Sequence, residues 1–261
     1  MGKNKLKKFD EMKHFRFVFE YPWARLQQEP FPLKGGWRDF FGSQAPLTVE
    51  LGCGKGEYTV GLARRFPTQQ FVGIDVKGAR MWTGAKQVEQ EQLDNAAFLR
   101  GDIDTLDAFF APAEVNALWI TFPDPQMQKP RKRLTGTRML EIYRKVLAAD
   151  GRVNLKTDSP FLYAYTKLMC QANGLAIFHD CDDIYGSDPT DEMPEGLTSI
   201  RTHYEQQWLD RGLTIKFLSF SPFNGKELVE PEGGEELDKD TYRSYSRGYI
   251  QMPQLLAGED Q

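Results

Sequence analysis

A glycine-rich segment is the first part of the chain whose residue types suggest chemistry. It reads Glu50-Leu51-Gly52-Cys53-Gly54-Lys55-Gly56 and joins an expected strand to an expected helix. Gly52, Gly54 and Gly56 let the backbone turn tightly and approach a ligand closely, and the following helix offers unpaired N–H groups. Dinucleotide-binding loops have the spacing GxGxxG, whereas this loop has GxGxG. Glu50 would repel a pyrophosphate but suits an ammonium group, so the loop favours S-adenosylmethionine over NAD.

Two further carboxylates follow the next two expected strands, at the edge of the sheet where such folds bind ligands. Asp75 ends the second strand, and its carboxylate can accept hydrogen bonds from both hydroxyls of a ribose. Asp102 follows the third strand and could accept a hydrogen bond from the exocyclic amine of adenine. Either aspartate alone also fits an ordinary surface loop. Together with Glu50 and the glycine loop, they predict a site for a nucleotide-type cofactor.

A proline-flanked aspartate follows the fourth expected strand, in the order Pro123-Asp124-Pro125. Proline fixes its own backbone φ angle, so two prolines stiffen the loop and hold the carboxylate in place. In a methyltransferase of this architecture, such a loop lies next to the methyl group that is transferred. Asp124 is therefore the candidate catalytic residue, although the motif alone also fits a simple turn.

Charge is unevenly distributed along the chain. The formal net charge is −4 and the isoelectric point about 5.6, yet nucleic-acid binding depends on local potential. Basic residues gather near the N-terminus and again after Asp124, where they are Lys129, Arg131, Lys132, Arg133 and Arg138. This second cluster is expected to contact RNA phosphates, which position a nucleic acid without reading its sequence. An acidic tract at 227–240 is expected to be a solvated surface, and solvation explains the N-terminal lysines equally well.

Short apolar runs alternate with stretches of helical periodicity. This pattern indicates an α/β fold with a doubly wound, mostly parallel seven-stranded sheet, similar to the Rossmann fold. The expected strands are 47–51, 70–75, 96–99, 116–122, 151–156, 175–179 and 214–220. The expected helices are 56–66, 79–92, 134–148, 160–173 and 199–209. Asp158 or Ser159 caps the fourth of these helices, with Pro160 in its first turn.

Three regions are expected along the chain. Residues 1–45 are rich in charge, aromatic residues and proline, and are expected to form an arm with little regular structure. The aromatic side chains of this arm are expected to pack on the core rather than on RNA. Residues 46–225 hold the catalytic domain. Residues 226–261 contain the acidic tract and either extend this domain or form a tail.

Composition places the chain among ordinary globular proteins, with 40% hydrophobic and 27% charged residues in a length of 261. No apolar run approaches the length of a membrane span, and the lysine-rich N-terminus lacks the apolar core of a signal peptide. The three cysteines, Cys53, Cys170 and Cys181, are odd in number and form no CxxC pair. We therefore expect no disulfide framework, no metal site, no membrane partner and a cytoplasmic location.

In these motifs the chain resembles the tRNA (guanine-N7-)-methyltransferases, over roughly residues 46–220. The resemblance rests on the glycine loop with Glu50, Gly73-Ile74-Asp75-Val76, Phe122-Pro123-Asp124-Pro125 with the basic run after it, Thr157-Asp158, and Thr202-His203-Tyr204-Glu205. It implies that S-adenosylmethionine is the cofactor, that the four carboxylates described above line its site, and that Asp124 is central to catalysis. It also implies that the substrate is a guanine in the variable loop of tRNA.

The resemblance further implies which residues meet the tRNA. In this family a lysine follows the catalytic aspartate, usually as Asp-Pro-Trp-Pro-Lys, whereas here Lys129 stands one place later. Lys129 and Arg131 are the candidate contacts on this side of the site. The other candidates are Asp158, Thr202, His203, Tyr204 and Glu205. The family's last segment reads Thr-Lys-Phe-Glu, so His203 replaces a lysine.

The chemistry expected of such a site needs few groups. N7 of guanine has a free lone pair and no proton, so no general base has to activate it. The protein mainly has to place N7 in line with the methyl group, after the base has left any stack. Methylation leaves the purine positively charged, and a fixed carboxylate stabilises that charge more than the neutral ground state. Asp124 or Asp158 could do this, or could hold the N1/N2 edge of guanine.

Three other interpretations fit parts of the sequence. A small-molecule methyltransferase of the same fold explains the cofactor loop but not the basic run after Asp124. A DNA amino-group methyltransferase has a similar loop, but Asp124-Pro125-Gln126 lacks the second proline and the aromatic residue found there. An RNA-binding protein that keeps the fold without activity has no need of four acids. The sequence leaves open whether the protein is a monomer or a homodimer.

Overall fold

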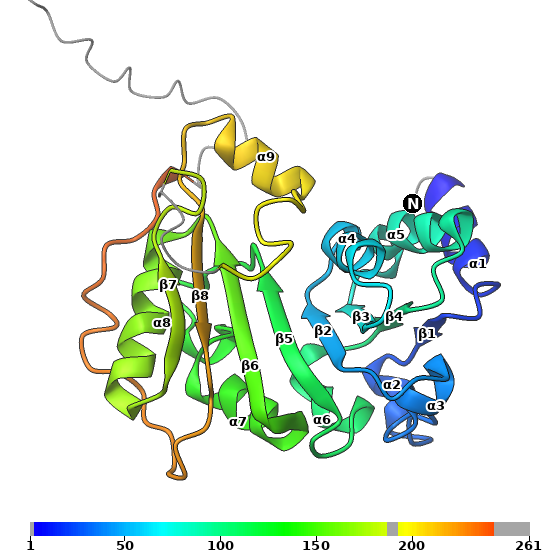
Figure 1. Cartoon of the computed structure of the whole chain (residues 1–261), viewed down its shortest axis with the longest axis horizontal. Helices are drawn as coiled ribbons and strands as arrows, with labels where there is room; N and C mark the ends of the chain where they lie inside the picture. The colour runs from blue at the N-terminus through cyan, green and yellow to red at the C-terminus, as the bar shows by residue number, and fades with distance from the viewer. Residues whose placement is uncertain (1–2, 187–192, 243–261) are drawn as a thin grey trace, which may run out of the picture.

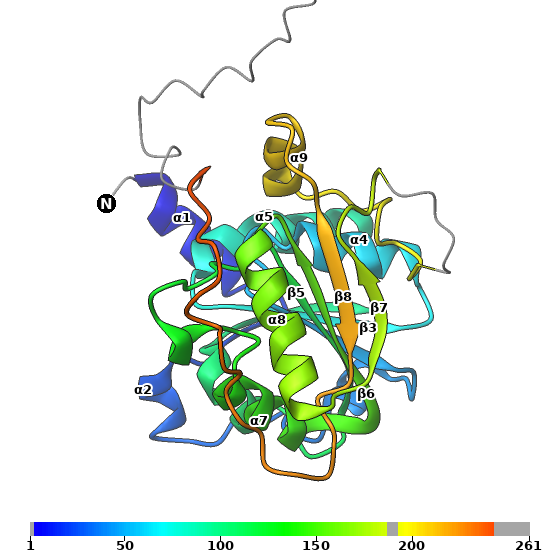
Figure 2. The same cartoon turned by 90° about the vertical axis from the view of Figure 1, so that its left-hand side faces the viewer.

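The computed structural model describes residues 3–186 and 193–242. In this part of the chain, helices flank a single sheet (Figure 1, Figure 2). The strands are β1 (Val18–Glu20), β2 (Leu47–Leu51), β3 (Gln70–Asp75), β4 (Ala96–Arg100), β5 (Val115–Thr121), β6 (Leu147–Thr157), β7 (Ile177–Cys181) and β8 (Lys216–Phe220). The α-helices are α1 (Lys3–Met12), α2 (Trp23–Leu26), α3 (Trp37–Phe41), α4 (Glu57–Arg65), α5 (Gly78–Glu91), α6 (Leu106–Phe109), α7 (Thr137–Val146), α8 (Pro160–Asn173) and α9 (His203–Leu209). Two 3₁₀ helices are η1 (Ile103–Thr105) and η2 (Pro130–Lys132).

The strand order is β1-β4-β3-β2-β5-β6-β8-β7. Strands β1 to β6 are parallel, and β8 runs antiparallel between β6 and β7. The strand order therefore reverses between β2 and β5, near the centre of the sheet: β3 and β4 follow on one side of β2, and β6 follows on the far side of β5. Because crossovers between parallel strands are right-handed, the reversal puts α4 and α5 on one face and α7 and α8 on the other. It also parts the loops at the carboxyl ends of β2 and β5, which is where such sheets bind ligands.

The predicted fold class is confirmed, and each expected strand and helix is present with shifts of a few residues at its ends. Every residue of β2 and β3 is buried, as expected of parallel strands that are covered on both faces, and this includes the polar Thr48 and Glu50 of β2. Of the two residues predicted to cap α8, Ser159 does so. Its hydroxyl accepts a hydrogen bond from the Leu162 N–H at 2.9 Å. No helix among the described residues is long and apolar enough to cross a membrane.

Within the described residues the sheet has eight strands rather than the seven predicted, because the expected arm contributes β1. This strand pairs in parallel with β4, with Val18 opposite Phe98 and Glu20 opposite Arg100. A strand of three residues at a sheet edge is too short to show a periodicity, so the sequence pattern missed it. Residue 46 is therefore not a boundary of the sheet.

Aromatic side chains of the arm pack on the core, as predicted from the sequence. The Phe19 ring lies 5.6 Å from that of Trp37 and 6.0 Å from that of Phe31, both in edge-to-face contacts. Trp37 is fully buried, stacks on Phe110 at 5.6 Å and donates its indole N–H to the Phe109 carbonyl at 3.1 Å. These contacts fix the arm to the segment between β4 and β5.

A buried ion pair joins β6 to α9. The ammonium of Lys156 lies 2.7 Å from a carboxylate oxygen of Glu205, and neither side chain has any exposed surface. The same ammonium donates to the Leu197 and Ile200 carbonyls, at 2.5 and 3.2 Å. Burial lowers the pKa of Lys156, and the neighbouring Glu205 opposes this shift. One buried cation therefore holds the segment 197–205 to the sheet.

Glu205 also completes a capping box at the start of α9. The Thr202 hydroxyl accepts a hydrogen bond from the Glu205 N–H at 3.1 Å, and the Glu205 carboxylate accepts one from the Thr202 N–H at 3.3 Å. Tyr185 donates its hydroxyl to the same carboxylate at 2.8 Å. Glu205 thus binds Lys156, Thr202 and Tyr185 at once.

We expect Glu205→Gln to lower the free energy of unfolding by about 3–5 kcal/mol, because it leaves the Lys156 ammonium buried without a carboxylate. Urea denaturation measures the change. Glu195→Gln is the matched control: it breaks an exposed pair with Arg65 (N–O distance 2.6 Å) and is expected to cost about 0–1 kcal/mol. Equal losses in the two variants would contradict the role given to the buried pair.

Candidate active site

A cavity of about 560 Å³ lies at the carboxyl ends of β2 to β5, in the crevice that the strand reversal creates. Four residues predicted for the cofactor site line it, namely Gly52, Asp75, Asp102 and Asp124. They follow four different strands and are brought together by the strand order. Lys132, from the basic cluster, lines the same cavity.

The glycine loop leaves room for a ligand beside Gly52. The φ angle of this residue is +76°, and a Cβ atom placed on it would meet no other atom within 4 Å. Gly56 is required for a different reason. Its φ is +74°, and a Cβ atom there would come within 2.5 Å of the Phe98 ring. The first glycine therefore opens the loop to the cavity, and the last one packs α4 against the sheet.

Asp75 lines the cavity and also holds the glycine loop. Its carboxylate accepts hydrogen bonds from the N–H groups of Gly54 and Lys77, at 2.9 and 2.7 Å, one on each oxygen. Because a carboxylate oxygen can accept two hydrogen bonds, each oxygen keeps capacity for a ligand hydroxyl. This geometry is compatible with the ribose contact predicted for Asp75.

Glu50 lies behind the cavity wall and is 3% exposed. One carboxylate oxygen accepts hydrogen bonds from the N–H and hydroxyl of Thr59, at 2.9 and 2.5 Å, and the other from the Thr121 hydroxyl at 2.6 Å. Burial raises the pKa of Glu50 from 4.5 to about 7, and the hydrogen bonds from Thr121 and Thr59 oppose the rise. The sequence predicted the carboxylate but neither threonine, because both arrive from other elements.

Asp102 is exposed and caps η1, since its carboxylate accepts a hydrogen bond from the Asp104 N–H at 3.1 Å. Asp104 in turn pairs with Arg138 at 3.0 Å. The structure places Asp102 on the cavity wall, and its contact with adenine stays a prediction.

The loop after β5 carries Asp124 on a constrained backbone. Phe122 and Gln126, on either side of it, have φ angles of +50°, a left-handed conformation that residues other than glycine rarely adopt. The exposed Asp124 carboxylate accepts a hydrogen bond from the side-chain amide of Gln126 at 3.2 Å. The Phe122 N–H donates to the Lys156 carbonyl at 2.8 Å, which ties the loop to the end of β6. The aspartate is thus presented by a loop with little freedom.

Arg133 supports this loop, a role that the sequence analysis missed. It is 2% exposed and donates to the carbonyls of Met127 and Gln126, at 2.9 and 3.3 Å. Its guanidinium lies 4.3 Å from the centre of the Tyr165 ring and 4.9 Å from that of Phe161. The expectation that Arg133 contacts RNA phosphates is corrected, because its side chain is engaged inside the protein.

The other cations of the cluster surround a second cavity, of about 870 Å³, next to the first. Lys129, Arg131 and Lys132 are exposed on its wall, and so is Arg138, in the first turn of α7. Lys132 lines both cavities, so the basic surface is continuous with the acid-lined one. The structure therefore places the predicted phosphate contacts Lys129 and Arg131 beside the Asp124 loop.

Asp158, predicted to meet the substrate, directly follows β6 and has no exposed surface. Its carboxylate accepts a hydrogen bond from the hydroxyl of Tyr242 at 2.7 Å. Nothing in the motif Thr157-Asp158 indicated a partner from the far end of the chain.

The segment 202–205, also predicted to meet the substrate, divides into a buried and an exposed half. Thr202 and Glu205 form the capping box and are 8% and 0% exposed. His203 and Tyr204 are exposed, with ring centroids 5.9 Å apart. The His203 N–H donates to the Glu57 carboxylate at 2.9 Å, so this turn contacts the start of α4. The two exposed residues are the ones whose side chains are accessible to a large substrate.

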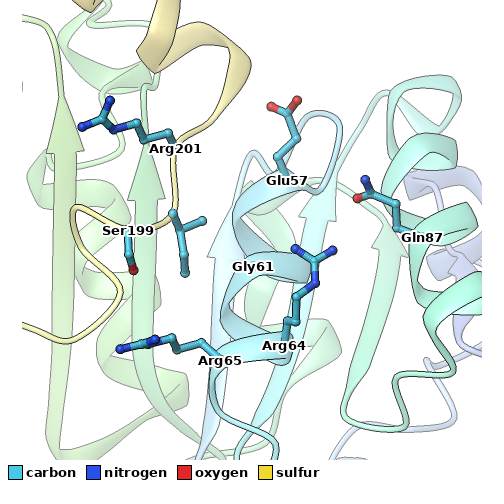
Figure 3. A pocket seen from close by; sticks show the side chains of 8 residues that line it. Glu57, Gly61, Arg64, Arg65, Gln87, Ser199 and Arg201 are labelled. Carbon is cyan, nitrogen blue, oxygen red and sulfur yellow. The ribbon is translucent and has the colours of Figure 1, made fainter.

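A further cavity, of about 590 Å³, lies between α4, α5 and the loop before α9 (Figure 3). Its wall includes Arg64, Arg65 and Arg201. Arg64 donates twice to Glu91, both times at 2.7 Å, and Arg65 pairs with Glu195 at 2.6 Å. Carboxylates thus balance two of its arginines, and its wall lacks the row of strand-end acids found in the first cavity.

Solved methyltransferase structures share this arrangement of strands and helices. The 16S rRNA methyltransferase KamB has a TM-score of 0.55 and 13% identity to this chain, and the match covers 74% of this chain and 94% of that protein. A 30S ribosomal A1408 methyltransferase from an uncultured bacterium has a TM-score of 0.51 at 15% identity, covering 72% and 92%. At such low identity, the likeness shows the fold alone.

Sequence comparison gives a closer relation. The profile of a family described as "Putative methyltransferase" matches residues 44–218. The tRNA (guanine-N(7)-)-methyltransferase of Porphyromonas gingivalis is 55% identical over 244 residues, covering 90% of this chain and 96% of that protein. The protein of the same name from Bacteroides fragilis is 50% identical over 248 residues, covering 95% and 96%. With such identity over nearly its whole length, the chain belongs to the family of tRNA (guanine-N7-)-methyltransferases.

Proposed function

We propose that this protein transfers the methyl group of S-adenosylmethionine to N7 of a guanine in the variable loop of tRNA. The observation that carries the proposal is the junction of two cavities, one lined by Asp75, Asp102 and Asp124 and the other by exposed lysines and arginines. Carboxylates suit a cationic cofactor, and clustered cations suit a polyanionic substrate. The names of the two relatives support methylation at N7 of a guanine in tRNA.

The residues of the first cavity fit S-adenosylmethionine. The space beside Gly52 admits a ligand close to the backbone, and Asp75 keeps acceptor capacity for ribose hydroxyls. Asp102, after the next strand, is assigned to the adenine amine. Glu50 lies behind the loop, where its carboxylate attracts an ammonium group through an interior of low dielectric constant. When bound, the cofactor supplies an electrophilic methyl group.

Asp124 is assigned the central role in the transfer. N7 of guanine needs no base, so the protein has to align its lone pair and stabilise the positive charge that develops on the purine. A carboxylate on a constrained loop does this without reorganising, because it is oriented beforehand. Asp124 lines the cavity, so we assign it to the developing charge. The family resemblance supports Asp158 at the N1/N2 edge of guanine; because Asp158 has no exposed surface, this contact requires the segments packed over it to open as the base enters.

The tRNA is proposed to lie across the basic surface, with Lys129 and Arg131 on its phosphates. Such contacts position an RNA without reading its sequence, and the target base leaves its stack to enter the cavity. The exposed His203 and Tyr204 stand at another side of the same sheet edge, on a turn shaped by the capping box. A methyltransferase acting on a small molecule would have no use for these exposed cations.

Methyl transfer from labelled S-adenosylmethionine to an unmodified tRNA transcript tests the function, with 7-methylguanosine as the expected product. In the same assay we expect Asp124→Asn to lower kcat by about 10²–10³-fold, because an amide cannot stabilise the positive purine. Its dissociation constant for S-adenosylmethionine should rise by much less than kcat falls. Asp150→Asn, at an exposed position near the start of β6, is the control and should behave as the unmodified protein. Near-normal turnover by Asp124→Asn would refute the assigned role.

Binding of S-adenosylmethionine is expected to depend on the ionisation of Glu50. The pKa of this group rises from 4.5 to about 7 on folding, so the stability contributed by its proton is present below pH 4.5 and is lost as the pH rises through 7. A nearby ammonium favours the ionised form instead. We therefore expect affinity to rise by up to about tenfold between pH 6 and pH 8, with release of a proton.

Calorimetry in buffers of different ionisation enthalpy measures both the affinity and the proton release. Glu50→Gln keeps the shape of the side chain but cannot titrate, so it should lack this part of the pH dependence. Titration of the ligand itself affects both proteins equally and cancels in the comparison. Identical pH profiles for the two proteins would exclude the assigned role of Glu50.

Charge reversal on the basic surface should weaken tRNA binding. For the double variant Arg131→Glu/Lys132→Glu, we expect the slope of log K against log salt to become shallower by roughly 1.5–2, as two phosphate contacts are lost. Arg152→Glu/Lys226→Glu is the matched control, because it changes net charge equally at exposed positions near the amino ends of the parallel strands. An equal change of slope in both double variants would show that the contact site for RNA lies elsewhere.

A further inference from the structure

Residues 221–242, here called the C-terminal strap, leave β8 and return along α8 to the carboxyl edge of the sheet (Figure 2). Arg144 of α7 holds the beginning of the strap. It donates to the Pro222 carbonyl at 2.7 Å, the Asn224 side chain at 2.7 Å and the Lys226 carbonyl at 2.8 Å. The strap therefore starts from a fixed point on the body of the domain.

The middle of the strap is held at both helices that it crosses. The Asn173 side chain, at the end of α8, donates to the Val229 carbonyl at 2.9 Å and accepts from the Val229 N–H at 2.8 Å. Glu230 accepts hydrogen bonds from the N–H and hydroxyl of Thr137, at 3.2 and 2.7 Å. Since Thr137 begins α7, this carboxylate compensates the positive end of a helix. The acidic tract is thus partly engaged in the fold, rather than simply solvated as predicted.

The strap then reaches the candidate active site. Asp240, which is 8% exposed, accepts hydrogen bonds from the Ser159 hydroxyl and the Phe161 N–H, at 2.5 and 3.2 Å, at the N-terminus of α8. Its own N–H lies 3.2 Å from the sulfur of Met127. Met127 belongs to the loop that follows Asp124, so the strap contacts the catalytic loop directly.

Tyr242 connects two further parts of the site. Its hydroxyl donates to Asp158 at 2.7 Å, and its ring lies edge-on to Trp208 of α9, with centroids 5.4 Å apart. The last described residues of the strap therefore join the Asp124 loop, the end of β6 and α9.

We propose that Tyr242 is a positioning residue for methyl transfer, which holds the Asp158 carboxylate in the orientation that receives the guanine. The inference rests on the proposed function, in which Asp158 binds the N1/N2 edge of the base. The terminal torsion of an aspartate is broad, whereas a paired contact with two N–H groups needs both oxygens in the plane of the base. The phenol on one oxygen fixes that plane, and the packing on Trp208 keeps the phenol in place.

The test compares Tyr242→Phe with Tyr163→Phe in the full-length protein. Each substitution removes one hydroxyl that donates to an aspartate; Tyr163 of α8 donates to Asp180 of β7, which lies two strands along the sheet from β6. Thermal midpoints, the dissociation constant for S-adenosylmethionine, and kcat and KM for tRNA are measured. We expect similar small losses of stability and cofactor binding within about twofold in both variants. Only Tyr242→Phe should lose kcat/KM for tRNA, by about 10- to 100-fold.

A double-mutant cycle with Asp158→Asn shows whether the tyrosine acts through Asp158. In that background Tyr242→Phe should have no further effect on kcat/KM, because the group that it positions is already altered. Additive effects, equal losses in the two tyrosine variants, or a gain of activity in Tyr242→Phe would each overturn the proposal. The gain would mean that the hydrogen bond shields Asp158 from the substrate. Absence of 7-methylguanosine with the unmodified protein would instead overturn the proposed function, and this inference with it.

Discussion

The reversal of strand order between β2 and β5 is the constraint on which the rest of the structure depends. It turns the loops after four parallel strands toward one crevice, so that residues distant in sequence become neighbours. Asp75, Asp102 and Asp124 share a cavity because of this strand order, since they are far apart in the sequence. The same arrangement leaves the ends of β2 and β6 inside the protein, where Glu50 and Lys156 have almost no contact with water.

Ionisable groups buried at these strand ends need partners, since an unpaired polar group without water is costly. Each partner comes from an element other than the strand whose end it serves. The pairs are Glu50 with Thr59 and Thr121, Lys156 with Glu205, and Asp158 with Tyr242. The polar groups of the active edge therefore also hold α4, α9 and the C-terminal strap to the sheet. Fold and site depend on the same contacts, and a substitution here has to be tested for both.

Local patterns are what the sequence could predict. Buried parallel strands appear as apolar runs, so the strands, and with them Asp75 and Asp124 at their ends, could be located without a structure. Packing between distant segments could not be predicted. Arg131 and Arg133 stand two places apart in one basic run, yet the first is exposed and the second lies buried over two aromatic rings. The partner of Asp158 is 84 positions away, and no rule of spacing connects the two.

The net charge of −4 is compatible with RNA binding because acidic and basic side chains lie on different parts of the surface. Carboxylates line the cavity assigned to a cationic cofactor, and Glu230 and Asp240 serve helix N-termini. The exposed cations Lys129, Arg131 and Lys132 lie beside the cavity, with Lys132 at the boundary between the two surfaces. At physiological ionic strength the Debye length is about 8 Å, so a phosphate there interacts mainly with the nearest cations. The net charge also counts acidic residues elsewhere on the chain, and it therefore says little about how a polyanion binds at this site.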